Sequence, residues 1–200
     1  MAARAGPSAW PRPDCKGPPA ACPRGINPGR TYRFYTGSPV IPFGFGLSYT
    51  TFTYTLVRAP SSLSLAPLAR LLRDTTARTG ASHFPRMSDA AASGASYVVN
   101  VTNMGGMDAD DAVLGFVHPP GAGTGGVPLK SLFGFERVHV KAGATVSVYL
   151  YPALTDFAIT AADGTRVARA GTFKVSFGVG APGMGYVEAP LEASTADVEG

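Results

Sequence analysis

Cysteine, tryptophan and charged side chains are scarce in this 200-residue sequence. It contains 2 cysteines and 1 tryptophan, and Asp, Glu, Lys and Arg together make up 15% of the residues. Both cysteines, Cys15 and Cys22, lie in a proline-rich stretch outside any strand pattern, so the sequence supports neither a disulfide framework nor a zinc site. We therefore expect no metal and no cofactor.

Long apolar runs and clusters of basic residues are also missing. No run reaches the length of a bilayer-spanning helix, and Met1–Cys22 lacks the apolar centre of a signal peptide. The net charge of +4 comes mainly from arginines in two separate segments, without a nucleic-acid-binding motif. We expect no membrane partner, no nucleic-acid partner and no signal peptide in this chain.

Glycine and proline are abundant, at 25 and 18 residues. This composition is typical of short strands joined by turns, and the length suits one compact domain with extensions. We divide the chain into a disordered leader (1–28), a docking segment (29–46), an all-β domain (47–178) with a long surface insertion (58–96), and a flexible tail (179–200).

Alternation of apolar and polar residues predicts the strands of the domain. Val99 and Val101 alternate with polar neighbours, as do Phe173, Val175 and Phe177, so these residues are expected to form the core. The Leu-rich patch within the insertion predicts a turn or two of helix. The predicted strands are Leu47–Val57, Tyr97–Asn103, Ala112–His118, Glu136–Val140, Thr145–Tyr151, Asp156–Thr160 and Thr172–Val179.

Several motifs follow one another along the chain. The aromatic string in Pro28–Gly37, followed by Pro42–Phe52, is similar to the passage that leads into the last domain of family 3 glycoside hydrolases, and most of all to the plant-type enzymes of their β-xylosidase branch. Asn103–Asp108, Pro128–Val138 and Ala170–Gly178 resemble that domain itself. The resemblance implies an immunoglobulin- or fibronectin type III-like β-sandwich.

The resemblance also implies what this chain lacks. In the family, the nucleophile and the acid/base residue belong to preceding domains, so we expect no catalytic residue here and an inactive chain. The parent enzyme would be extracellular and hydrolyse O-glycosyl bonds of xylan or a related polysaccharide. The domain would dock on the preceding catalytic domains, and one of its loops would contact oligosaccharide at the rim of their cleft.

The docking candidates fall into two groups. The first either clamps over the preceding domain or folds back on the sandwich; it comprises Arg30, Tyr32, Arg33, Tyr35, Phe43 and Phe45. The second is Glu136 with Arg137, which either docks the domain or forms an ordinary salt bridge at a strand edge.

Other polar residues carry weaker signals. Asp108, Asp110 and Asp111 are expected to lie at a turn without a pocket or partner, which argues against catalysis. The histidines, which lack the spacing of metal ligands, are expected on the surface or in loops: His83, His118 and His139. Asn100-Val101-Thr102 fits the acceptor rule for N-glycosylation, with Asn100 facing outwards.

Two alternatives to an accessory structural domain remain open. One is a stand-alone sandwich that binds carbohydrate or protein, although the only tryptophan, Trp10, lies in the leader. The other is a gene fragment without a function of its own, which sequencing of the upstream transcript would reveal. Glycan binding that survives removal of residues 1–46 would favour the first.

Overall fold

A computed structural model describes residues 29–79, 93–161, 163–181 and 184–196. The predictions for the leader, with Trp10, Cys15 and Cys22, and for His83 lie outside the described residues.

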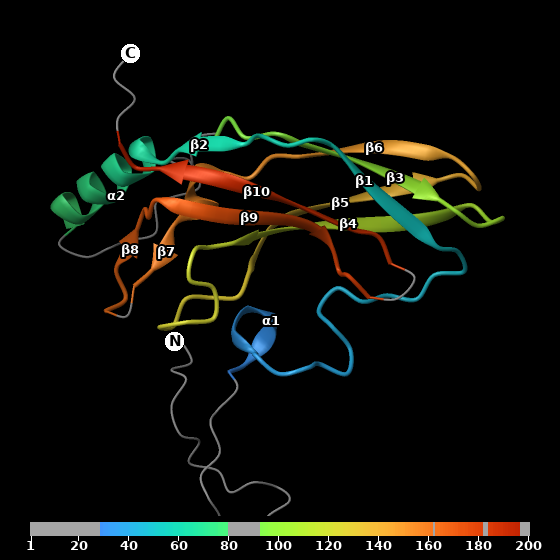
Figure 1. Ribbon diagram of the computed structural model, residues 1–200, viewed down its shortest axis with the longest axis horizontal. Helices are drawn as coiled ribbons and strands as arrows, with labels where there is room; N and C mark the ends of the chain where they lie inside the picture. Colours follow the sequence, from blue (N-terminus) through green and yellow to red (C-terminus); the bar gives the residue numbers. More distant parts are fainter. Residues whose placement is uncertain (1–28, 80–92, 162, 182–183, 197–200) are drawn as a thin grey trace, which may run out of the picture.

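Two sheets pack face to face, which confirms the predicted all-β sandwich (Figure 1). The three-stranded sheet, in the order β1-β3-β6, is antiparallel and comprises β1 (Phe52–Arg58), β3 (Tyr97–Asn103) and β6 (Thr145–Leu150). The five-stranded sheet has the order β2-β10-β9-β4-β5, from β2 (Ser62–Ser64), β10 (Tyr186–Ser194), β9 (Gly171–Gly178), β4 (Ala109–His118) and β5 (Ser131–Val140).

The core lies between the sheets, and the period-two pattern explains its composition. Val99 and Val101 of β3 and Phe173, Val175 and Phe177 of β9 are fully buried, as expected. Inward residues of the other strands complete the core, among them Phe52, Tyr97, Val113, Val117, Val140, Val148, Leu150 and Leu191.

The segment predicted as a surface insertion contributes to the core, so this prediction is wrong in part. Helix α2 (Ala66–Thr79) begins after β2 at one end of the sandwich (Figure 1). Leu68 and Leu72 are buried, because their spacing of four residues places them on one side of the helix, and Leu65, just before the helix, is buried as well. Among the described residues, no helix is long and apolar enough to cross a membrane.

The predicted flexible tail is also wrong, because it contains β10. This strand pairs antiparallel with β9 from Tyr186↔Gly178 to Ala193↔Gly171 and buries Leu191. Pro190 of β10 has no backbone N–H to donate. It lies outside the stretch that pairs with β2, so the pairing of these two strands loses no hydrogen bond. The alternation of Glu188, Pro190 and Glu192 with apolar residues is a normal strand pattern.

The predicted strand Asp156–Thr160 is mostly a turn. A 3-10 helix, η2 (Leu154–Phe157), precedes the short strand β7 (Ile159–Thr160), which pairs with β8 (Arg166–Val167). The Asp156 carboxylate accepts a hydrogen bond from the backbone N–H of Ala153 (2.7 Å), and this bond favours the helical turn over an extended strand.

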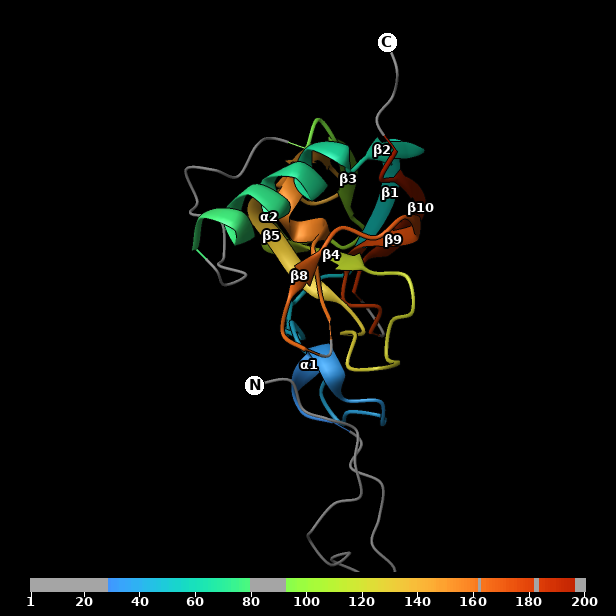
Figure 2. The same cartoon turned by 90° about the vertical axis from the view of Figure 1, so that its left-hand side faces the viewer.

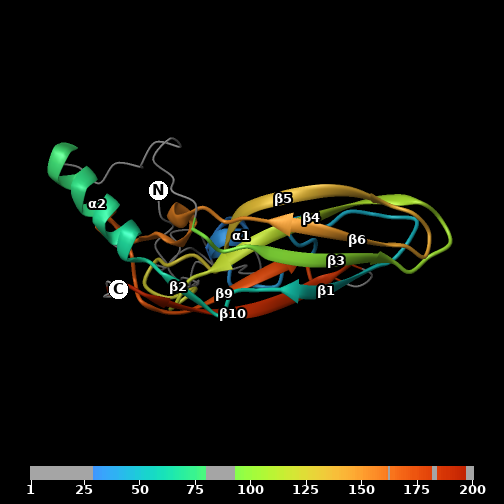
Figure 3. The same cartoon turned by 90° about the horizontal axis from the view of Figure 1, so that it is seen from above.

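The docking segment runs along the outer side of the five-stranded sheet before it enters the other sheet. Its one-turn helix α1 (Thr31–Phe34) lies beneath that sheet, on a different side of the sandwich from α2 (Figure 2). From there the chain passes below β4 and turns upwards into β1 (Figure 1). Seen from above, β1, β3 and β6 cross over the five-stranded sheet (Figure 3).

Candidate functional site

An aromatic cluster anchors the start of the docking segment on β4. The Tyr32 and Phe43 rings stack with their centroids 4.2 Å apart, and both meet the Phe116 ring at a steep angle, at 5.9 and 6.2 Å. Phe116 is fully buried beneath them, and the Lys130 ammonium lies 4.2 Å from its ring centroid. Such ring pairs stabilise by about 0.5–1.5 kcal/mol beyond area burial.

Two hydrogen bonds from backbone N–H groups also hold the start of the docking segment against residues 129–132. The N–H of Leu129 donates to the Arg33 carbonyl (2.6 Å), and the N–H of Leu132 donates to the Tyr32 hydroxyl (3.3 Å). Tyr32 and Phe43 therefore fold back on the sandwich, one of the two alternatives that the sequence left open. Sequence reasoning missed Phe116 as their anchor, because residues 112–117 contain no polar side chain and their pattern does not show which face each residue covers.

The remaining residues of the first docking group have different surroundings. Arg30 is exposed at the start of α1, and the exposed Arg33 guanidinium lies 5.5 Å from the ring centroid of Phe34. Tyr35 is half-buried and folds over Gly37. None of these three contacts the Tyr32–Phe43 stack in any recorded ring pair of the described chain.

The end of the docking segment presents large apolar side chains to water. Val40 and Leu47 are 99% and 93% exposed, and Tyr49 is 94% exposed. Ile41 and Phe45 are partly exposed as well. We call these five residues the apolar loop. Its far end is fixed, because the Thr50 hydroxyl donates to the Asn103 side chain.

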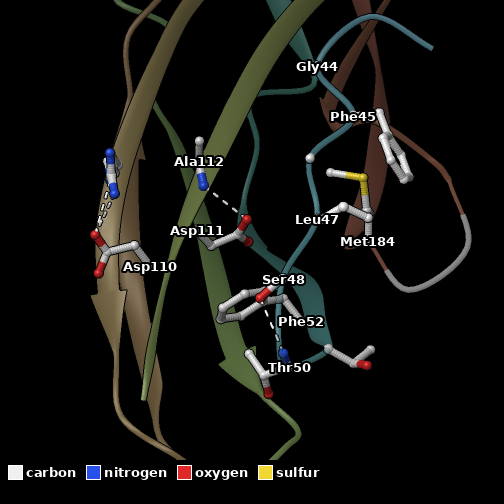
Figure 4. Close-up of a pocket in the computed structure, with 13 residues that line it drawn as sticks. Gly44, Phe45, Leu47, Ser48, Thr50, Phe52, Asp110, Asp111, Ala112 and Met184 are labelled. Carbon is white, nitrogen blue, oxygen red and sulfur yellow. Dashed lines mark hydrogen bonds and ion pairs between the residues drawn. The ribbon is translucent and has the colours of Figure 1, made fainter. Parts of the chain in front are cut away.

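A pocket of about 380 Å³ lies between the apolar loop and the beginning of β4 (Figure 4). Its walls are residues 44–48 and 50–52, with Asp110–Ala112 of β4, Arg137 of β5, and Met184. In Figure 4, Asp111 points towards the loop, whereas Asp110 points to the neighbouring strand β5. The prediction that the acidic turn has no pocket and no partner is therefore wrong.

Asp110 bridges two side chains of β5, Arg137 and His139, at the rim of this pocket. Its carboxylate accepts from Arg137 Nη2 (2.8 Å) and meets His139 Nδ1 at 2.7 Å, and these bonds lower the pKa of Asp110. Glu136 is not the partner of Arg137, because neighbouring strand residues point to opposite faces. The Arg137 side chain is 72% exposed, so solvent screens this ion pair and the pair adds little to stability.

Asp111 is bonded on the inner side of the same strand. One oxygen accepts from the Tyr54 hydroxyl (2.7 Å) and the other from the N–H of Ala112 (2.9 Å). Burial, with the nearby carboxylate, raises the pKa of Tyr54 well above its usual range. The described residues contain no group of three or more His, Cys, Asp or Glu able to hold a metal ion.

Asn103 organises the turn that leads into β4, the strand that carries these carboxylates. The sequence pointed to the motif as a whole but not to this role of its first residue. The side chain is fully buried. Its oxygen accepts from the Thr50 hydroxyl (2.5 Å) and the Gly105 N–H (3.0 Å), while its amide donates to the carbonyls of Met107 (2.7 Å) and Val140 (3.0 Å). All the hydrogen-bonding positions of the amide are filled.

His118 is half-buried on the outer face of the five-stranded sheet, not on a loop. Its Nε2 lies 2.8 Å from the Ser176 hydroxyl. Burial first, then the charges of Lys174 and Lys130, lower its pKa to about 4, against a smaller opposing effect of Glu188. The folded protein therefore keeps this imidazole neutral in mild acid.

We expect stability to fall as the pH drops from about 6.5 towards 4, because an unfolded histidine takes up a proton near 6.5 and folded His118 does not. His118→Gln, which can keep a hydrogen bond to Ser176, should flatten this part of the curve of unfolding free energy against pH. Thr53→Gln, at an exposed position with no ionisable side chain, is the control. Equal slopes for wild type and His118→Gln would contradict the prediction.

Asn100 lies at the centre of the three-stranded sheet, on its outer face. The side chain is half-buried, and its oxygen accepts from the Ser147 hydroxyl (2.7 Å). The outward orientation expected from the alternation of β3 agrees with this contact.

Comparison with known proteins shows the family to which this chain belongs. A family model described as the fibronectin type III-like domain matches residues 111–180. β-D-xylosidase 1 of Arabidopsis thaliana is 41% identical over 128 residues, which are 62% of this chain and 16% of that protein. Exo-1,4-β-xylosidase of Aspergillus awamori is 32% identical over 155 residues, 77% of this chain and 18% of that protein. The chain thus spans less than a fifth of the length of these two relatives.

Solved structures share the fold. A family 3 exo-β-xylosidase, in complex with a xylobiose aziridine activity-based probe, superposes with a TM-score of 0.62 at 23% identity over 84% of this chain and 20% of that chain. A β-glucosidase from Listeria innocua has a TM-score of 0.55 at 17% identity over 80% of this chain and 18% of its own. At such identities the likeness shows the fold alone.

Proposed function

This chain carries the carboxy-terminal fibronectin type III-like domain of the β-xylosidase branch of glycoside hydrolase family 3, and from that premise we propose that it docks on and braces catalytic domains. The parent activity would be hydrolysis of O-glycosyl bonds in xylan or a related polysaccharide, in the extracellular space. The observation that carries the proposal is the apolar loop, which is exposed yet held in place.

The apolar loop has the properties of an uncovered interface. Val40, Leu47 and Tyr49 are almost wholly in contact with water, although such side chains are normally buried or scattered singly. Phe43, within the loop, stacks on Tyr32 and packs against Phe116, and Thr50, after Tyr49, bonds Asn103, so the shape of the loop is largely set before a partner binds. The pocket behind it offers a seat for one side chain of the partner.

The same site is unsuited to hydrolysis. Retaining glycosidases need two carboxyl groups about 5–5.5 Å apart, one to attack and one to exchange protons with the sugar oxygen. Both oxygens of Asp110 are bonded to Arg137 and His139, and both oxygens of Asp111 are bonded to Tyr54 and Ala112. These carboxylates organise the sandwich, and we expect the chain alone to release no xylose from xylobiose.

A chimera tests the docking role. Residues 29–196 would replace the matching region of the Arabidopsis β-D-xylosidase 1, and hydrolysis of an aryl β-xyloside would be measured together with the melting temperature. We expect an active chimera. Leu47→Asp with Tyr49→Asp should lower its activity and yield by roughly tenfold or more, because burying an unpaired charge costs several kcal/mol.

Val57→Asp provides the matched control, since Val57 is 59% exposed on the opposite sheet. It should leave activity and melting temperature close to those of the unsubstituted chimera. Equal behaviour of the control and the double variant would reject the apolar loop as the interface.

The docked domain would also contact oligosaccharide at the rim of the catalytic cleft. Arg137 and Asp110 present planar polar groups beside the pocket, and such groups suit sugar hydroxyls. If they contact substrate, Arg137→Ala in the chimera raises KM for xylotriose and leaves kcat unchanged. Calorimetric binding of xylotriose by the isolated chain would instead favour a stand-alone carbohydrate-binding sandwich.

A further inference from the structure

Two cross-strand rows on the outer face of the three-stranded sheet carry no charged side chain. Thr53, Thr102 and Thr145 align in one row, and Thr55, Asn100 and Ser147 in the next. We call these two rows the hydroxyl face. The row beside it aligns Arg58, Val98 and Tyr149. Exposed protein surfaces carry about a quarter to a third of charged residues, so two adjacent rows without a charge call for an explanation.

The centre of the hydroxyl face is the only N-glycosylation acceptor triplet in the sequence, Asn100-Val101-Thr102. The Asn100 side-chain oxygen accepts from Ser147 on one side, so its amide nitrogen, the atom that carries a glycan, is not needed for that bond. Across the strands its neighbours are Thr55 and Ser147, both smaller than the charged and aromatic side chains common on exposed strands.

We propose that Asn100 carries an N-linked glycan and that its first sugars cover the hydroxyl face. The proposal rests on the extracellular location inferred above, since it requires passage through a compartment that transfers glycans. It explains why the face needs no charges: a glycan keeps it in solution and prevents association between uncharged faces of two copies.

The transfer is chemically balanced. The Asn100 amide nitrogen forms a bond to the anomeric carbon of an oligosaccharide carried on a polyprenyl diphosphate, the carbon–oxygen bond to the diphosphate breaks, and the diphosphate leaves with that electron pair. The amide loses one proton. The reaction takes place on the nascent chain, so the later pairing of β3 with β1 and β6 does not obstruct it.

Tyr149 provides a surface for the sugar. It is 56% exposed and pairs with Val98, one outward position along the strand from the Asn100–Ser147 pair. Diagonal neighbours on a sheet lie about 7–8 Å apart, within reach of an aromatic ring. The apolar side of the first N-acetylglucosamine would pack on this ring while its hydroxyls face the threonines.

The test is secretion of the full chain, behind an exogenous leader, from yeast. We expect intact mass spectrometry to show one oligosaccharide that peptide N-glycanase removes with conversion of Asn100 to Asp. Asn100→Gln and Thr102→Ala should each abolish it, and Thr102→Ser should keep it. If the secreted, folded protein carries no oligosaccharide that the glycanase removes, the proposal is overturned. Thr102→Ala provides a second test in case Asn100→Gln does not fold.

A separate experiment tests whether the first sugar lies over the hydroxyl face. After trimming to a single N-acetylglucosamine, we expect nuclear Overhauser contacts between this sugar and the Tyr149 ring; their absence would reject coverage. Occupancy does not depend on docking, so an inactive chimera with an occupied Asn100 would reject the docking function alone.

Discussion

Replacing Asn103 with alanine is expected to lower the free energy of unfolding by about 2–4 kcal/mol, because several buried polar groups lose their partners at once. The carbonyls of Met107 and Val140 would lose the amide donor, and the Gly105 N–H its acceptor. For a chain of this size the melting temperature should fall by on the order of 10 °C.

The matched control is Asn100→Ala in unglycosylated protein made in bacteria. Asn100 lies three residues earlier on β3, and its recorded hydrogen bond, to Ser147, is exposed. We expect a loss below about 1 kcal/mol. Urea denaturation of both variants measures the difference, and equal losses would show that the Asn103 network does not stabilise the turn.

Phe116→Ala should destabilise the protein by about 3–5 kcal/mol, the usual range for removal of a buried aromatic ring. The substitution also removes the surface on which Tyr32 and Phe43 rest. Segment 29–46 should then detach, and trypsin should cleave after Arg30 and Arg33 faster than in the wild type, at temperatures where both proteins remain folded.

Phe45→Ala separates loss of the anchor from general loss of aromatic surface. Phe45 belongs to the same segment and is 39% exposed, so its removal should cost much less and leave tryptic cleavage unchanged. If Phe116→Ala were cut no faster than this control, the segment would be held by its backbone hydrogen bonds alone.

The alternation of apolar and polar residues was sufficient to predict most strands and the core, because a sheet with one buried face requires an apolar side chain at every second position. Val99 and Phe173 were predicted inside for that reason and lie there. The same rule would have revealed β10: Val187, Ala189, Leu191 and Ala193 alternate with polar residues, but small side chains made the pattern resemble a linker.

The candidate site was less predictable, since it depends on contacts between distant residues. Aromatic residues such as Tyr32 suit a partner domain and a fold-back on the sandwich equally well, and only the position of Phe116 decides between them. The partner of Arg137 lies 27 residues away on another strand, so proximity in sequence wrongly suggested Glu136.

The pairing of β2 with β10 has a consequence for how fast this protein folds. Ser62 lies opposite Glu192 in a parallel pair, so forming it closes a loop of most of the domain. Non-local contacts of this kind place folding in the millisecond-to-second range typical of β-sandwiches. Until that loop closes, Glu192–Ser194 of β10 form an open sheet edge, and chaperones that shield such edges would have most effect during this interval.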